Sequence, residues 1–144
     1  MSDGQGPAEN DKPTPRAIVA GHGDFANGLV SAVDLITGRG GQLIPVAVPG
    51  LCAEDIEALI RERMRESGVK VIFTDLQAGS CTMAARRILR GVDDALLIAG
   101  VNLPTLLDFV FADQMPVIDA ARRSAERGRS AITVVGSAGG VKQA

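Results

Sequence analysis

The chain has 144 residues, of which 46% are apolar and 22% are charged, values that fit one globular domain and exclude intrinsic disorder for most of its length. Its net charge is -2 and it contains no Trp or Tyr, so neither the basic surface nor the stacking platforms of a nucleic-acid-binding protein are expected. Two Cys and one His exclude a disulfide framework and do not favour a structural zinc site.

The sequence has no apolar run approaching the roughly 20 residues of a membrane-spanning helix, and no signal peptide led by Lys or Arg. We therefore expect a cytoplasmic protein that is not inserted in a membrane. Residues 1–15 are rich in Pro and Gly and contain no large apolar residue after Met1. Such a segment cannot bury enough surface to offset its ordering entropy. We predict a flexible tail over residues 1–15, a folded domain over 16–136 and a C-terminal tail over 137–144.

Short apolar runs alternate along the chain with segments whose apolar residues recur every three or four positions. The runs indicate strands buried on both faces, and the periodic segments indicate helices. Asp24 and Gly38 are suited to cap the first helix, and Pro45 weakens the second strand or places it near a sheet edge. The predicted elements are, in chain order, strand 17–20, helix 25–37, strand 43–48, helix 54–66, strand 69–74, helix 82–89, strand 95–99, helix 103–111, helix 116–127 and strand 131–135.

This order predicts an α/β domain with a doubly wound, mostly parallel sheet and helices on both faces. In open sheets of this type, ligands bind at the carboxyl ends of the strands. The segments that follow the first, third and fourth strands are therefore the candidate site. They are residues 21–24, 75–80 and 100–102.

The first candidate segment holds the only His of the chain, His22, between two glycines and near the predicted start of a helix. Helix N-termini favour anions such as phosphate, and imidazole is a good nucleophile near neutral pH. These properties favour a phosphoryl-accepting histidine, and the alternative is a loop His with a satisfied hydrogen bond. A dinucleotide-binding motif is not favoured, because Ala26 stands where its third glycine belongs.

The second candidate segment holds Asp75 at the end of the third predicted strand and Ser80 near the start of the next helix. Asp75 can approach His22 if the first and third strands are neighbours. A carboxylate bound to one imidazole nitrogen leaves the other nitrogen as the nucleophile. Ser80 can then hold phosphate oxygens. The alternatives are that both residues cap a turn or a helix, or that Asp75 is itself the acceptor of an aspartyl-phosphate receiver.

Cys81 offers a further alternative, a thiolate nucleophile at a helix N-terminus, although a small half-buried residue is the simpler interpretation. Two groups of arginines are interpreted as solvated helix faces, either of which can instead receive an acidic protein partner. These groups are Arg86, Arg87 and Arg90, and Arg122, Arg123, Arg127 and Arg129.

A family resemblance is carried by AIVAGHGDFANGL at residues 17–29, FTDLQAGSCT at 73–82 and IAGVNLPTLL at 98–107. Together these blocks resemble the mannose-type enzyme IIA domain of the bacterial phosphotransferase system, over about residues 16–135. The resemblance implies a phosphoryl carrier that accepts phosphate from the phosphohistidine of the carrier protein HPr. It also implies that the carrier passes the phosphate to an enzyme IIB during sugar uptake. Neither a cofactor nor a metal ion is expected to take part.

The resemblance also implies a role for each candidate residue. His22 would be the acceptor through its Nε2 atom, Asp75 would orient the other ring nitrogen, and Ser80 would lie beside the phosphoryl group. Family members are homodimers that can exchange their last strand. In this chain that strand would be residues 131–135, lying antiparallel at the edge of the sheet.

Two residues depart from the family's usual Gly-Gly-Ser-Pro segment. Ala78 restricts backbone angles that Gly allows, and Cys81 replaces a Pro that begins a helix. Two alternatives within the same chemistry stay open. One is a regulatory module that reports its phosphorylation state without serving sugar uptake. The other is the related phosphotransfer subunit of dihydroxyacetone kinases.

Overall fold

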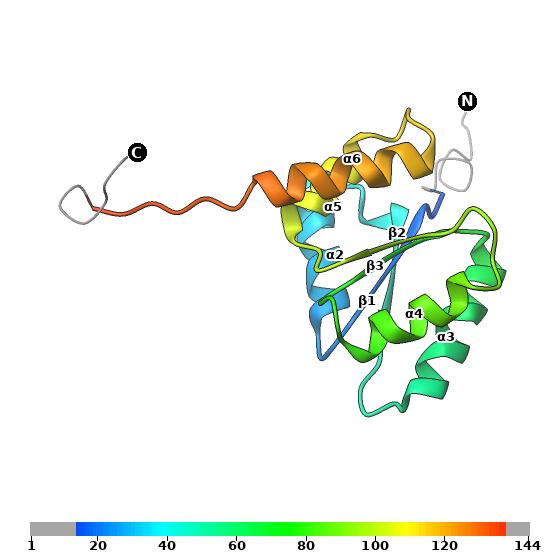
Figure 1. The fold of residues 1–144 in the computed structure, drawn as a ribbon. Coiled ribbons are helices and arrows are strands. Elements are labelled where there is room, and N and C mark those ends of the chain that lie inside the picture. The colour runs from blue at the N-terminus through cyan, green and yellow to red at the C-terminus, as the bar shows by residue number, and fades with distance from the viewer. Residues whose placement is uncertain (1–13, 138–144) are drawn as a thin grey trace.

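In the computed structural model, which describes residues 14–137, four short strands pair in parallel in the order β2-β1-β3-β4 (Figure 1). The predicted α/β architecture with a parallel sheet is therefore confirmed, and the first and third strands are neighbours as the site prediction requires. The elements are β1 (Ala17–Gly21), α2 (Phe25–Thr37), the 3-10 helix η1 (Gly40–Gln42), β2 (Leu43–Ala47), α3 (Ala53–Ser67), β3 (Val71–Thr74), α4 (Ser80–Leu89), β4 (Leu96–Ala99), α5 (Leu103–Phe111) and α6 (Val117–Ser130).

Strand β1 shows why the sheet is covered on both faces. Successive side chains of a strand point to opposite faces. Ala17 and Val19 belong to one buried cluster, whereas Ile18 and Ala20 belong to another. The first cluster includes side chains of α2, α5 and α6, and the second includes side chains of α3 and α4 (Figure 1). The predicted doubly wound arrangement follows from this alternation.

The predicted boundaries hold for α2 and α5 and shift for the other helices. Helix α4 begins at Ser80 rather than at residue 82, and α6 runs to Ser130 rather than to residue 127. The longer α6 has a packing reason, since a Cβ on Gly128 would overlap Thr105 Oγ1 of α5. Gly128 therefore marks the close approach of two helices and does not end α6. Pro45 lies in β2, an edge strand, as one of its two predicted placements requires.

The predicted final strand over residues 131–135, antiparallel at the sheet edge, is wrong for this chain. All strand pairs are parallel, and residues 132–137 have no strand or helix assignment. The segment runs away from the sheet after α6 (Figure 1), with Val134 95% and Val135 90% exposed. The apolar run carries the pattern of a buried strand, but the direction in which α6 ends gives it no partner strand among residues 14–137.

The two predicted tails fall almost entirely outside the described part of the chain, which begins at residue 14 and ends at 137. Within that part, none of the helices combines the length and the apolar character needed to cross a bilayer.

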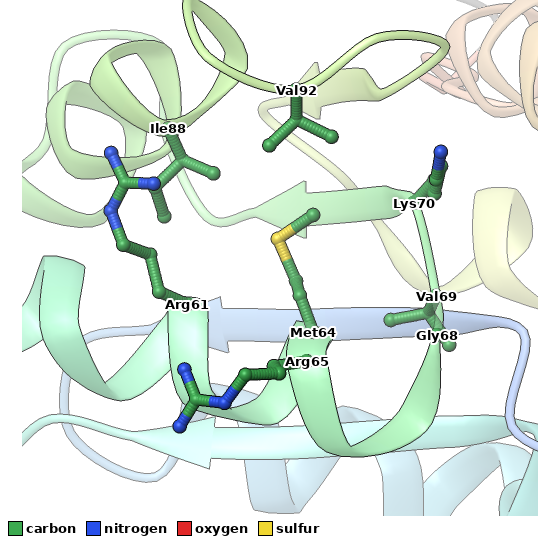
Figure 2. A pocket seen from close by; sticks show the side chains of 8 residues that line it. All are labelled: Arg61, Met64, Arg65, Gly68, Val69, Lys70, Ile88 and Val92. Atoms are coloured by element: carbon green, nitrogen blue, oxygen red, sulfur yellow. The ribbon is translucent and has the colours of Figure 1, made fainter.

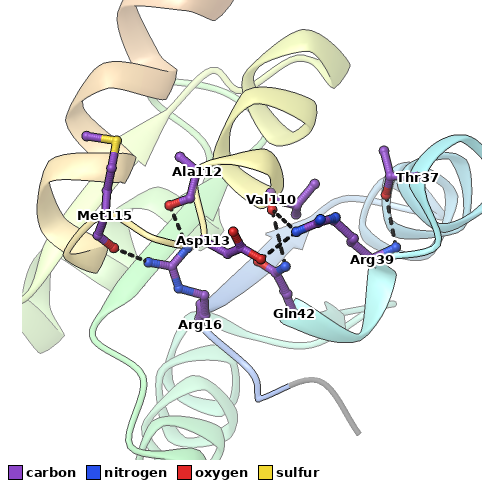
Figure 3. Close-up of polar contacts among 8 residues, drawn as sticks. All are labelled: Arg16, Thr37, Arg39, Gln42, Val110, Ala112, Asp113 and Met115. Atoms are coloured by element: carbon purple, nitrogen blue, oxygen red, sulfur yellow. Dashed lines mark hydrogen bonds and ion pairs between the residues drawn. The ribbon is translucent and has the colours of Figure 1, made fainter. Parts of the chain in front are cut away.

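A set of hydrogen bonds and an ion pair connects the residues around the start of β1 with those that follow α5 (Figure 3). Arg16 donates to the carbonyls of Ala112 at 3.3 Å and Met115 at 2.7 Å. Arg39 pairs with Asp113 at 2.5 Å. Burial lowers the pKa of Arg16, and the nearby Asp113 carboxylate opposes this shift. These contacts lie at the amino end of β1, so they hold the end of the sheet opposite to the candidate site.

Candidate functional site

His22 and Asp75 meet at the carboxyl ends of the two central strands. The imidazole Nδ1 lies 2.7 Å from Asp75 Oδ2, and the backbone N–H of His22 donates to the same oxygen at 2.8 Å. The pairing of Ala20 with Thr74 in the sheet register brings both chain segments out at one point. The His22 side chain is 56% exposed, whereas that of Asp75 is only 8% exposed. The predicted approach of Asp75 to His22 is therefore present.

Gly21 makes this approach possible. A Cβ at this position would lie 2.5 Å from Phe25 Cδ2 and 3.1 Å from Asp75 Cβ. Any side chain here would push the start of α2 or the Asp75 loop outward. The turn that follows is closed by the N–H of Phe25, which donates to the His22 carbonyl at 3.0 Å.

Two opposing effects set the pKa of the Asp75 carboxyl group. Burial alone raises the pKa, but the hydrogen bonds from the backbone N–H and the imidazole of His22 outweigh it, so the pKa lies below its ordinary value. Asp75 is therefore a carboxylate at neutral pH and can only accept hydrogen bonds. The proton in the contact must then belong to Nδ1, which leaves Nε2 with its lone pair free.

The imidazole ring lies against the beginning of α4. Gly79 is the N-cap of this helix, and a Cβ there would lie 3.1 Å from His22 Cε1. No side chain caps α4, so the N–H groups of its first turn are available to an anion. Ser80 is the first residue of the helix and half-buried. Ser80 directly follows the residue that lies against the imidazole, and no hydrogen bond joins its side chain to that of His22 among the described residues.

The expected caps of α2 are half confirmed. Gly38 ends the helix with a φ of 73°, and its N–H donates to the carbonyl of Asp34 at 2.7 Å. Asp24 occupies the N-cap position, but its side chain makes no capping hydrogen bond. Its φ of -92° and ψ of 14° are the reason, because a capping side chain needs an extended backbone.

The surroundings of Cys81 do not suit a thiolate nucleophile, and those of Asp75 do not suit the phosphate acceptor of an aspartyl-phosphate receiver. Cys81 is fully buried, and burial together with the negative charge of Asp75 raises its thiol pKa to about 11. The thiol therefore stays protonated at neutral pH and is no thiolate nucleophile. Asp75 Oδ2 accepts hydrogen bonds from His22, and the Asp75 side chain is largely covered. A receiver needs an exposed carboxylate instead.

Sequence reasoning missed two buried threonines next to the site. Thr74 and Thr82 are fully buried, and their hydroxyl oxygens lie 2.5 Å apart. The Thr82 hydroxyl also donates to the carbonyl of Leu76 at 2.5 Å. The sequence does show one hydroxyl residue before Asp75 and one after it. Their contact was not predicted, because the sequence pattern places residue 82 at the start of a helix and not among the loop contacts.

An apolar hollow lies elsewhere, between the end of α3 and α4 (Figure 2). It has a volume of about 290 Å3, a floor that includes Met64 and Ile88, and a rim with Arg61 and Lys70. Lys70 precedes β3, so this hollow is at the amino end of the sheet. His22 follows the carboxyl end of β1, so the hollow is not part of the candidate site.

Comparison with solved structures shows which domains share this fold. The mannose/sorbose specific IIA subunit of the phosphotransferase system from Enterococcus faecalis superposes with a TM-score of 0.74 at 19% identity, covering 86% of this chain and 96% of that one. The phosphotransferase system component EIIA from Streptococcus agalactiae gives 0.67 at 21% identity, covering 78% and 93%. A sigma-54 interaction domain protein from Enterococcus faecalis gives 0.68 at 12% identity, covering 83% and 93%. No curated protein matches the chain.

The fold and the site define a doubly wound α/β domain with a single histidine held at the centre of its strand ends. Residues 16–126 match the model of a protein family described as the PTS system fructose IIA component, where PTS is the phosphotransferase system. The chain belongs to this family, which confirms the resemblance seen in the sequence. Family membership supports a phosphoryl-carrier role in the phosphotransferase system in general terms.

Proposed function

We propose that the protein is a cytoplasmic phosphoryl carrier that accepts phosphate from phospho-HPr on His22 and passes it to an enzyme IIB for sugar uptake. The observation that carries the proposal is the 2.7 Å contact between His22 Nδ1 and the Asp75 carboxylate. This contact fixes a proton on Nδ1, so that the neutral imidazole carries its free lone pair on Nε2, the nucleophile.

In the transfer step, the Nε2 lone pair attacks the phosphorus of the donor's phosphohistidine. A new P–N bond forms to His22 while the donor's P–N bond breaks, and the electron pair of that bond returns to the donor's imidazole. His22 gains positive charge as the bond forms, and the Asp75 carboxylate stabilises it through the Nδ1 proton. The N-terminal N–H groups of α4 and the Ser80 hydroxyl face the transferred group and offset its negative charge. Transfer to enzyme IIB is the same step with the roles reversed.

We also propose that the working form is a homodimer in which residues 131–135 of each chain pair with β4 of the other. Ile132 is 72% exposed, and Val134 and Val135 are more exposed still, which is unusual for an apolar run. β4 is an edge strand, and beside it lies a hollow of about 390 Å3 lined by Leu97, Ile98 and Ile132. Light scattering on the full chain and on a chain ending at Ser130 tests this, because only the full chain is expected to dimerise.

Phosphorylation in vitro tests the main proposal. The protein and its His22→Ala variant are incubated with enzyme I, HPr and radiolabelled phosphoenolpyruvate. We expect acid-labile, base-stable label on the wild type alone. Label that survives in His22→Ala but disappears in Asp75→Asn would identify a receiver instead. An unlabelled wild type with a native circular dichroism spectrum, after more than one HPr has been tried, would refute the carrier role.

A regulatory role is the second candidate. The observation that favours it is the fold shared with a sigma-54 interaction domain protein, a likeness that extends over 83% of this chain. In that case the protein would accept phosphate from HPr and report its phosphorylation state to another protein. Phosphoryl transfer onward to a purified enzyme IIB separates the two candidates, because a pure sensor retains its label.

A further inference from the structure

Thr82 connects the residues on either side of Asp75. Its hydroxyl donates to the carbonyl of Leu76 at 2.5 Å, and its oxygen lies 2.5 Å from Thr74 Oγ1. A hydroxyl has a single proton, and in Thr82 that proton goes to Leu76, so Thr74 must be the donor to Thr82. A directed chain of hydrogen bonds therefore runs from Thr74 through Thr82 to Leu76.

Thr74, the first donor in this chain of hydrogen bonds, is held firmly in the sheet. Thr74 ends β3 between two neighbours, with Ala20 of β1 on one side and Ala99 of β4 on the other. Its carbonyl accepts the N–H groups of Gly100 and Val101, each at 3.0 Å. Thr74 and Thr82 are both fully buried, so water does not compete for their hydroxyls.

The Asp75 carboxylate has little else to fix its direction. Oδ1 is buried and has no hydrogen-bond partner in the described part of the chain. Oδ2 contacts only His22, the group that it must orient. The direction of the carboxylate therefore depends on the backbone that carries it. Thr82 holds the carbonyl of the residue after Asp75 and the side chain of the residue before it.

Thr82 also belongs to the first turn of α4, the helix whose N-cap Gly79 lies against His22. The Thr82 side chain thus links the helix start that lies against the imidazole Cε1 to the loop whose carboxylate contacts Nδ1. A shift between these two parts would misplace either the phosphoryl group or the imidazole, and small misplacements lower rates strongly.

We propose that Thr82 is a positioning residue for phosphoryl transfer, acting through its hydroxyl on Asp75 and hence on the tautomer of His22. The kinetic part of this inference rests on the proposed phosphoryl-carrier function, whereas the effect on the tautomer does not. Thr82 touches no reacting atom in this arrangement. It sets the geometry in which the Asp75 carboxylate reaches the ring.

Two substitutions of Thr82 test the role of the hydroxyl. Thr82→Val keeps the shape and removes both hydrogen bonds, and Thr82→Ser keeps the hydroxyl. In Thr82→Val we expect phosphorylation by phospho-HPr to slow roughly tenfold, with Thr82→Ser close to wild type. The imidazole nitrogen shifts at about pH 9 report the tautomer, and they belong to one residue because the chain has one His. We expect the Nδ1–H tautomer in wild type and Thr82→Ser, and a mixture in Thr82→Val.

Ser124→Ala is the matched control, because it removes another fully buried hydroxyl that donates to a carbonyl, in α6 and away from the site. It should lower stability without changing rate or tautomer. If Thr82→Val does not fold, Thr74→Val is used instead, because it removes the hydrogen bond that the Thr74 hydroxyl donates to Thr82. The inference is overturned if Thr82→Val keeps the wild-type rate and tautomer, or if Thr82→Ser fails equally. An unlabelled wild type refutes the carrier function, and the tautomer measurement still decides the role of Thr82.

Discussion

His22 offers two donors to one oxygen of Asp75: its backbone N–H at 2.8 Å and its ring Nδ1 at 2.7 Å from Oδ2. The imidazole and its own main chain are therefore held by a single acceptor. The ring cannot rotate about its side-chain bonds without losing a contact to a carboxylate that is almost completely covered. The charge of Asp75, more than its shape, should then matter for transfer.

Asp75→Asn separates charge from shape. The amide is nearly isosteric and can still accept a hydrogen bond, but it cannot stabilise the positive ring that forms as the phosphoryl group arrives. We expect the phosphorylation rate to fall on the order of 100-fold. Rapid-quench measurements with phospho-HPr provide the rate. A loss of less than about threefold, with an unchanged circular dichroism spectrum, would contradict this role for the charge.

The lowered pKa of Asp75 makes stability depend on pH. Since the folded pKa lies below the unfolded value of about 3.9, the contribution of the carboxylate is fully present above that value and is lost as pH falls through the folded pKa. Urea unfolding should show wild type more stable than Asp75→Asn at pH 7, with the difference shrinking below about pH 4. Exposed Asp93→Asn is the control, and an Asp75→Asn difference that is independent of pH would argue against the linkage.

Gly79→Ala tests the contact between His22 and the start of α4. The new methyl group would lie 3.1 Å from His22 Cε1 and from the Leu76 side chain, so the ring must move. We expect phosphorylation to slow about tenfold while the protein stays folded. Gly91→Ala is the matched control, because a Cβ there meets no heavy atom within 4 Å. Equal rates in the two variants would show that the contact does not matter.

Alkylation distinguishes the two cysteines. Cys52 is exposed, whereas Cys81 is buried and its thiol pKa is raised to about 11. Iodoacetamide at pH 8 should therefore add one group to the folded protein and a second only after unfolding, as read from the intact mass. Cys52→Ser should take up none while folded. Two adducts on the folded wild type would show that the surroundings of Cys81 open readily.

The sequence was sufficient for the sheet and for the pairing of His22 with Asp75, because both depend on local patterns. Buried apolar runs indicate parallel strands, and a rule about strand ends then places the two residues together. The start of α4 and the contacts of the Thr82 hydroxyl were missed, since they depend on residues that only the folded chain brings together.

The C-terminal segment shows a different limit of sequence reasoning. Residues 131–135 have the composition of a strand, but strand formation needs a partner edge, and composition does not say which chain provides it. Gly128 illustrates the same limit for helices. It lies just past the predicted helix end at residue 127, yet it belongs to α6, where Thr105 of α5 occupies the space of its missing side chain.

The position of β1 and β3 in the sheet has a consequence for the mobility of the domain. Both are interior strands, and every residue of each is buried, whereas β2 and β4 form the borders. Amide hydrogens in β1 and β3 should exchange only through global unfolding, while the border strands open more easily. A border strand can then open without disturbing the interior strands that carry His22 and Asp75, so local opening at the sheet edges leaves their contact intact.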